Sequence, residues 1–360
     1  MSDRFRELLK KVGSGTHTSK DLSRQEAEAA TSMMLLEEAT PAQIGAFMIA
    51  HRIKRPTAPE LTGMLDAYER IGPKLTTANL IGKKMPVVLG NPYDGRSRTV
   101  PVTPITALIL AVVGVPVILH GGDCMPTKYG VPLITIWQQL GVDFSSFSLA
   151  QTQEFFEKTG VGFVYLPQHF PQAHHLVSYR DQIGKRPPFA TIELIWTPLS
   201  EKAHAIAGFV HPPTENLFQE TFKLRRVEYY TTVKGLEGSC ELARSRTAII
   251  GMGQPDTGFE RLHLHPSDYD LGGPDVPLES TEQLMEQIQA VIQGKNTELM
   301  PSAILNGGFY LWRCGICPDL ASGFARAETT ITKGELAEKL RQLQNSCCLE
   351  LLATNAATRK

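Results

Sequence analysis

The chain has 360 residues, 42% hydrophobic and 20% charged, which is typical of a globular protein with one large domain or two unequal ones. A formal net charge of −1 gives no global sign of binding to nucleic acid or to an anionic membrane, although it leaves a local basic patch open. Gly114 and Pro116 break the longest apolar run, 104–119, which is shorter than the ~20 residues of a membrane span. The first residues lack the apolar core of a signal peptide, so we expect a cytoplasmic protein that does not enter a membrane.

Residues 1–80 show helical periodicity and no strand pattern. Apolar residues recur at helical spacing from Phe5 to Val12, and three further helices are predicted over 22–36, 42–52 and 57–71. Thr40 followed by Pro41 is a typical start for the third of these helices. The sequence therefore predicts a helical domain over 1–80 that packs against another part of the protein or dimerises.

From residue 85 onward, predicted strands and helices alternate. The predicted strands are 85–89, 115–119, 161–166, 205–210, 227–233 and 247–252. The predicted helices are 104–113, 132–140, 149–159, 172–183, 216–224, 281–293, 301–313 and 334–344, and 253–277 is predicted to be a loop. This pattern predicts the class α/β, with a larger domain over 81–360 built on a central, mostly parallel sheet.

Two turns follow the first two predicted strands, at 90–98 and 120–130. Ligands of open α/β sheets bind outside the carboxyl ends of the strands, so both turns are candidates for a binding site. On spacing alone, ordinary surface loops are an equally good interpretation.

Six cysteines do not make a disulfide framework in a chain of this length. Cys314 and Cys317 form a CxxC, which is a motif of redox and metal sites. Because no second CxxC or paired histidine lies near it, we expect ordinary core or surface thiols.

Several blocks resemble the anthranilate phosphoribosyltransferase family, also called glycosyltransferase family 3. They are 21–30, 38–44, 167–171 with Arg180 after it, and 305–308, so the similarity covers nearly the whole chain. The resemblance implies a small helical domain joined by hinges to a larger α/β domain, in a homodimer formed through the helical part. For a working member it also implies a role in tryptophan biosynthesis.

The reaction that the resemblance implies is transfer of phosphoribosyl from phosphoribosyl pyrophosphate (PRPP) to an aromatic amine such as anthranilate, with release of pyrophosphate. Such a site needs backbone N–H groups around the phosphates, a divalent metal to neutralise them, and a pocket that orients the acceptor. The implied cofactor is Mg²⁺.

The first phosphate-binding block of the family reads Gly-Thr-Gly-Gly-Asp and continues to a Ser-Thr pair. Gly90, Asp94 and Thr99 match this block, and Thr103 stands where the family has serine. The resemblance implies that these four residues bind substrate.

The same block also departs from the family. Pro92 and Tyr93 replace two glycines and Pro101 replaces an asparagine, which removes N–H donors and adds a side chain where backbone must approach a phosphate. Arg96 and Arg98 are additional cations, which either bind phosphate in another geometry or are solvated.

The second block of the family reads Lys-His-Gly-Asn-Arg. His120 and Gly121 match it and are implied substrate-binding residues. Leu119 and Asp123 replace the lysine and the arginine, and Lys128 restores one positive charge.

The metal-binding acid pair of the family corresponds to Cys240 and Glu241, so only the metal ligand Glu241 remains. One carboxylate is a poor Mg²⁺ site. Glu237 either substitutes for the lost aspartate or, the interpretation we favour, is a solvated surface carboxylate.

Arg180 matches the arginine that contacts the acceptor carboxylate in the family. We favour this role over the alternative, an arginine exposed on the surface of a helix.

Two functions are consistent with these residues. The first is a phosphoribosyltransferase with altered or lost activity. The second is a non-catalytic member of the family that binds nucleic acid, because the turns at 90–98 and 120–130 look more like that branch. Nucleic-acid binding would require a stripe of basic residues on the surface, and the alternative is that these charges are scattered and solvated. The residues of the predicted stripe are Arg52, Lys54, Arg55, Lys83, Lys84, Arg96 and Arg98.

Overall fold

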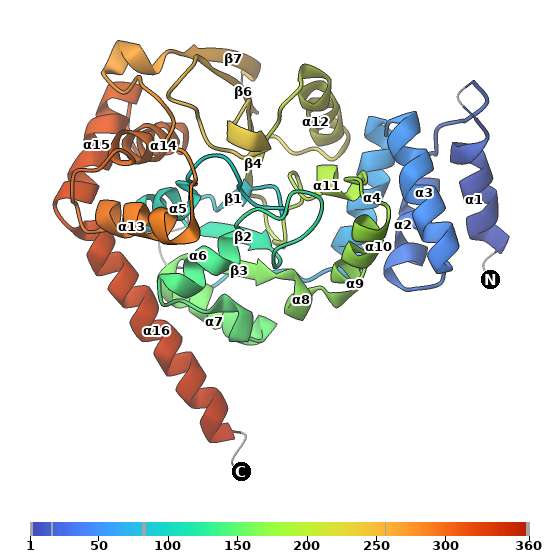
Figure 1. The fold of residues 1–360 in the computed structure, drawn as a ribbon, viewed down its shortest axis with the longest axis horizontal. Coiled ribbons are helices and arrows are strands. Elements are labelled where there is room, and N and C mark those ends of the chain that lie inside the picture. The colour runs from blue at the N-terminus through green and yellow to red at the C-terminus, as the bar shows by residue number, and fades with distance from the viewer. Residues whose placement is uncertain (1–2, 16, 81–83, 256, 358–360) are drawn as a thin grey trace.

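A computed structural model describes residues 3–15, 17–80, 84–255 and 257–357 (Figure 1). The first four helices form a bundle at one end of the molecule: α1 (Asp3–Gly13), α2 (Arg24–Leu35), α3 (Pro41–Lys54) and α4 (Ala58–Ile71). Capping boxes fix the starts of α2 and α3, where Ser23 pairs with Glu26 and Thr40 pairs with Gln43. These helices confirm the all-helical prediction for this part of the chain.

The rest of the chain is built on one seven-stranded sheet with the order β3-β2-β1-β4-β5-β6-β7. Its strands are β1 (Val87–Gly90), β2 (Val117–Gly121), β3 (Val161–Tyr165), β4 (His204–Gly208), β5 (Tyr230–Val233), β6 (Ala248–Gln254) and β7 (Gly258–Leu264). The first five strands are parallel to one another, and β6 and β7 are added antiparallel. The prediction of a mostly parallel sheet is confirmed.

The prediction of a loop over 253–277 is wrong, because β6 runs on to Gln254 and β7 lies within that range. Most of the side chains of β7 are exposed at the sheet edge, so the strand lacks the apolar pattern on which the prediction relied.

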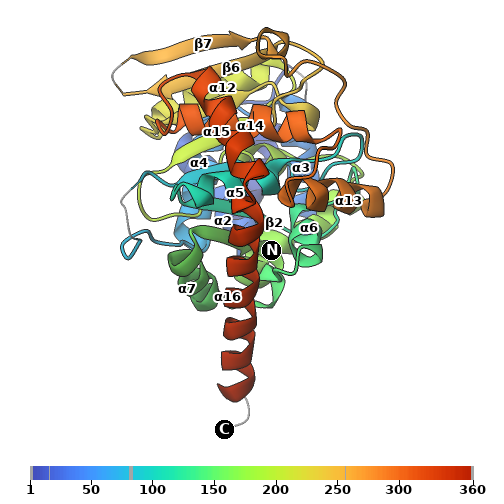
Figure 2. The same ribbon diagram turned by 90° about the vertical axis from the view of Figure 1, so that its left-hand side faces the viewer.

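The helices after β1 are α5 (Thr103–Val112), α6 (Leu133–Gln139), α7 (Leu149–Thr159), α8 (Leu166–His169), α9 (Pro171–His174), α10 (Val177–Gln182), α11 (Phe189–Ile192), α12 (Pro212–Leu224), α13 (Thr281–Ile292), α14 (Met300–Arg313), α15 (Leu320–Thr332) and α16 (Glu335–Ala357). The predicted helix over 172–183 is in fact parts of α9 and α10, and α15 was not predicted. The last helix, α16, runs well past its predicted end and projects from the body of the protein (Figure 2).

Each face of the sheet is covered by a separate apolar core. Alternate strand residues enter different cores: Val87 and Leu89 pack with α5, α13 and α14, whereas Val88 packs with the N-terminal bundle. The segment 166–199, which carries α8 to α11, packs in the second core together with α2, α3 and α4 (Figure 1). The middle of the chain thus covers the bundle side of the sheet.

Among the described residues, no helix has the length and apolar character that crossing a membrane requires. Cys314 and Cys317 lie in the turn between α14 and α15, and burial raises the pKa of Cys314 to about 12, which keeps its thiol protonated near neutral pH.

Candidate active site

The two predicted turns meet at the carboxyl edge of the sheet, after β1 and β2. Arg96 N–H donates to Val131 O (3.1 Å), Val131 N–H donates back to Arg96 O (2.7 Å), and Gly130 N–H donates to Asp94 O (2.8 Å). A Cβ at Gly130 would lie 2.5 Å from Arg96 O, so this close pairing requires glycine. The two turns therefore form one paired structure; whether they bind a ligand or are ordinary surface loops stays a prediction.

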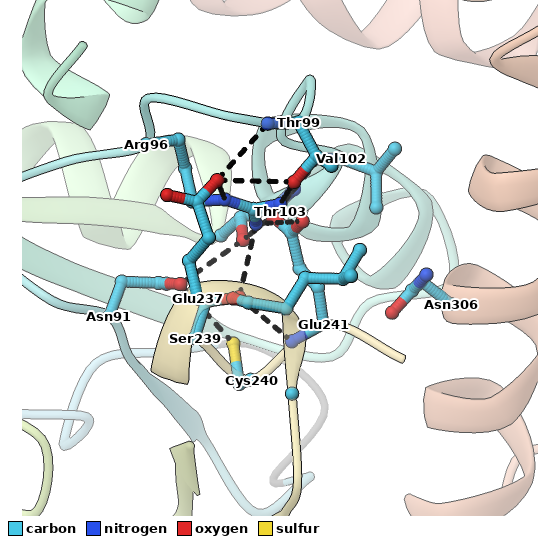
Figure 3. Close-up of polar contacts among 12 residues, drawn as sticks. Asn91, Arg96, Thr99, Val102, Thr103, Glu237, Ser239, Cys240, Glu241 and Asn306 are labelled. Atoms are coloured by element: carbon cyan, nitrogen blue, oxygen red, sulfur yellow. Dashed lines mark hydrogen bonds and ion pairs between the residues drawn. The ribbon is translucent and has the colours of Figure 1, made fainter. Parts of the chain in front are cut away.

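A third segment, the turn 235–241 that follows β5, enters this paired structure from the other side (Figure 3). We call it the acidic turn, because it carries Glu237 and Glu241. Its geometry depends on Gly235, at which a Cβ would lie 1.8 Å from Ser239 O.

Glu237 accepts hydrogen bonds from three consecutive main-chain N–H groups. The donors are Ser97 (3.1 Å), Arg98 (3.0 Å) and Thr99 (3.1 Å), and the Glu237 side chain is only 3% exposed. A run of N–H groups that converge on one carboxylate is the arrangement that proteins use to hold an anion. Glu237 is thus not the solvated surface carboxylate that we predicted.

Glu241 repeats this pattern at the start of α5. Its Oε1 accepts from Val102 N–H (3.0 Å), Thr103 N–H (2.9 Å) and the Thr103 hydroxyl (2.6 Å). Together the two glutamates receive five main-chain N–H groups from residues 97–103, as Figure 3 shows in part.

Two buried or half-buried cations neutralise the two carboxylates. The Arg96 guanidinium donates Nε to Glu237 (3.1 Å) and Nη1 to Glu241, and Lys128 Nζ pairs with the other oxygen of Glu237. Burial alone would raise the pKa of Glu237, but Lys128 and Arg96 outweigh it and hold that pKa well below its usual range. Arg96 is 4% exposed, so it is neither solvated nor available to a ligand in this conformation.

The acceptor side of the site is also internally paired. Arg180 is 2% exposed, and its Nη1 donates to Glu193 (3.0 Å) while Nη2 lies 3.7 Å from Asp94. Asp94 in turn accepts from Arg186 (3.1 Å). Arg180 is therefore not exposed on the surface of a helix, and the carboxylates of Glu193 and Asp94 lie beside its charge.

The remaining predicted site residues lie in the same region. The Tyr93 hydroxyl pairs with Nδ1 of His120, and burial lowers the pKa of that histidine to about 3. Gly90 ends β1, where a Cβ would lie 2.1 Å from Leu194 O, and Gly121 ends β2 beside Tyr93. Both glycines are enclosed by protein.

Comparison with known proteins adds the identity of the scaffold. Residues 6–70 match the helical bundle domain of the glycosyl transferase family, and residues 94–337 match its a/b domain. An anthranilate phosphoribosyltransferase of Afipia carboxidovorans is 30% identical over 95% of this chain and 98% of its own length. The chain belongs to the anthranilate phosphoribosyltransferase family. An uncharacterized protein of Aquifex aeolicus is 28% identical over 87% of this chain and 94% of its own.

Solved structures of the anthranilate phosphoribosyltransferase family share the fold. The yeast enzyme in complex with PRPP and Mg has a TM-score of 0.82 at 15% identity, over 97% of this chain and 99% of that one. The Thermus thermophilus enzyme has a TM-score of 0.75 at 20% identity, over 96% of this chain and 99% of that one. The sequence resemblance and the fold class are thus confirmed.

The family's Mg²⁺ does not fit the residues around Glu241. Both carboxylate oxygens of Glu241 already accept hydrogen bonds, one from Arg96 and the other from residues 102–103. At the neighbouring position, burial raises the pKa of Cys240 to about 12, so a neutral thiol stands where the family has a hard oxygen ligand. That Glu241 binds a metal stays a prediction, and this geometry counts against it.

Sequence reasoning named Glu241 as a site residue, but it assigned Glu237 to the surface and missed Glu193. A signal for the turn was present, because Glu237 and Glu241 follow a strand opposite a loop that has gained Arg96. The pairing of these charges depends on the loops meeting in three dimensions, which residue spacing does not give.

The predicted basic stripe is shorter than expected. Arg96 is buried and paired with the two glutamates of the acidic turn, and Lys54 pairs with the buried Glu60 (2.8 Å). Arg52, Arg55, Lys84 and Arg98 are exposed, and Lys83 lies outside the described residues.

Proposed function

We propose that this protein is a phosphoribosyltransferase homologue in which transfer of phosphoribosyl from PRPP to anthranilate is lost. The observation that carries the proposal is the occupation of the five N–H groups of residues 97–103 by Glu237 and Glu241. In this protein, carboxylates of its own chain take the place that phosphates of a substrate need.

A rough energy comparison supports this proposal. Hydrogen bonds to charged groups contribute about 1.5–3 kcal/mol each, and PRPP would have to replace all five that the two glutamates accept from main-chain N–H groups. PRPP would satisfy the same N–H groups, but only after two carboxylates had left Arg96 and Lys128 and the acidic turn had moved. The turn is held by Gly235 and by Ser239, whose hydroxyl accepts from Arg96 (3.1 Å).

We also propose the division of the chain that the sequence predicted: a helical domain over 1–80, and an α/β domain over 81–360. The packing of 166–199 against α2, α3 and α4 supports a close association of the two. A homodimer through the helical domain and a cytoplasmic location are part of the same proposal, by analogy with the family.

The test is an assay of anthranilate consumption, followed by its fluorescence, with PRPP and Mg²⁺ in excess. The protein is expected to give no rate above the reaction without protein, while the Afipia carboxidovorans relative, run in parallel, serves as the positive control. Turnover that depends on PRPP, Mg²⁺ and protein concentration would refute the proposal.

Nucleic-acid binding is the second candidate function, and one observation favours it. Arg52 at the end of α3 donates to Arg186 O (2.8 Å), so this exposed cation lies beside the segment that carries the exposed Lys185. Contacts of these cations with phosphates would make the affinity fall as salt rises.

Fluorescence anisotropy with labelled single-stranded and duplex DNA tests this candidate. Binding that weakens with salt and falls at least about tenfold in Arg52→Ala/Arg55→Ala supports it. The absence of binding at low salt, or affinity that this double variant leaves unchanged, counts against it.

A further inference from the structure

A separate hollow of about 690 Å³ opens between the start of β6 and the end of β7. It is formed by two loops, 244–247 and 265–274. The charged and imidazole side chains among its lining residues are Arg244, Arg246, His265 and Asp270. None of the site residues discussed above lines it.

Arg244 forms the wall of this hollow. Among the residues that the structure describes, its guanidinium donates to main-chain carbonyls alone, those of Leu271 (2.8 Å), Gly272 (3.2 Å) and Pro274 (3.3 Å). These bonds hold the loop in place but do not neutralise the guanidinium, since carbonyl groups carry no net charge.

Arg246 is exposed and more weakly held. Its Nη2 is 3.4 Å from both Lys234 O and Gly235 O, at the long limit of a hydrogen bond. His265 is exposed as well, and its Nδ1 bonds the Thr247 hydroxyl (2.9 Å), so this bond leaves Nε2 for another partner.

The positive charge of the hollow is only partly compensated, since Asp275 attracts Arg244 electrostatically without forming an ion pair with its guanidinium. Within the part of the chain that the structure describes, neither Arg244 nor Arg246 has an ion-pair partner within 4 Å. Asp275 accepts from the Arg244 main-chain N–H (2.8 Å) and from Ser245 (2.6 Å), and Asp270 is the one acid among the lining residues. The lining residues thus include two guanidinium groups and one carboxylate, with a second carboxylate, that of Asp275, beside Arg244.

We propose that this hollow is a binding site for a small phosphorylated molecule. Its volume lies within the range of about 300–1,000 Å³ that holds small ligands. Guanidinium groups match the geometry of phosphate oxygens and bind them by paired hydrogen bonds. The site is independent of the N–H groups of residues 97–103.

Isothermal titration with ribose 5-phosphate tests the proposal, with inorganic phosphate as the minimal probe and ribose as the uncharged control. We expect saturable binding of ribose 5-phosphate and none of ribose. Arg246→Ala should weaken binding about tenfold or more, since one charge-assisted contact is lost. Arg341→Ala, which removes an exposed arginine of α16, should leave the affinity unchanged.

His265→Ala provides a second variant that leaves the carbonyl bonds of Arg244 intact, and Arg244→Ala is avoided because those bonds hold the loop. Urea unfolding of each variant checks that it folds. The proposal would be overturned if neither ribose 5-phosphate nor inorganic phosphate bound saturably. It would also be overturned if neither Arg246→Ala nor His265→Ala changed the affinity.

Discussion

The candidate active site and the hollow beside it use the same kind of residue in opposite ways. In the active site, Arg96 ion-pairs with two carboxylates and Lys128 with one of them. In the hollow, Arg244 and Arg246 donate to neutral carbonyl groups. Although both regions are rich in cations, Arg96 is buried among carboxylates, whereas Arg246 of the hollow is exposed to solvent.

The difference shows that the partners of a cation, and not its presence, decide whether a site is open to an anion. A guanidinium bound by carboxylates has lost its electrostatic attraction for phosphate, whereas one bound by carbonyls keeps it. This contrast supports the proposal that acids of the same chain have closed a phosphate site, while the hollow remains available to an anion.

The largest loss of stability is expected when a carboxylate of the acidic turn is removed. Glu241→Ala leaves Arg96 buried with one partner fewer and strands the N–H groups of residues 102–103, so we expect a loss of about 3–5 kcal/mol in the free energy of unfolding. Urea denaturation measures it. Glu335→Ala, which breaks the half-exposed pair with Arg326, is the control and should cost at most about 1 kcal/mol. Equal effects of the two variants would contradict the account.

A smaller loss is expected at Arg180. Burial raises the pKa of Glu193 despite the opposing effect of Arg180, so this carboxyl can take up a proton when its partner is removed. Arg180→Ala should therefore cost about 2–3 kcal/mol, less than Glu241→Ala. The same urea series compares them, and a greater loss for Arg180→Ala would show that the acceptor side is the more important charge network.

A further effect appears only in acid. Because the folded-state pKa of Glu237 is lowered, its stabilising contribution is fully present above the unfolded-state pKa of about 4.3 and is lost as the pH falls below it. Glu237→Gln should flatten this part of the profile of stability against pH. Thermal unfolding between neutral pH and pH 3 measures it, and parallel profiles of the two proteins would exclude Glu237 as the source.

The smallest expected effect is that of Arg246→Ala. Since this exposed side chain makes only two long hydrogen bonds, the free energy of unfolding should change by no more than about 0.5 kcal/mol. Denaturation in urea without added phosphate checks this. A loss comparable to that of Glu241→Ala would make Arg246 a structural residue and would remove the contrast between the two regions.

Much of the fold followed from the sequence, because strands such as β1 and β2 are buried apolar runs between turn residues. The exposed edge strand β7 was not predictable in this way, since its side chains carry no burial pattern. For the site, the two turns were found, but Glu237 was assigned to the surface. Its role depends on a pairing across about 140 positions of sequence, which no local pattern contains.

The central claim is that the acidic turn fills the place of a pyrophosphate. Calorimetric titration of the protein with PRPP in the presence of Mg²⁺ tests it most directly. We expect no saturable heat of binding. Stoichiometric, Mg²⁺-dependent binding of PRPP would contradict the claim, because the N–H groups of residues 97–103 cannot hold both the glutamates and the phosphates.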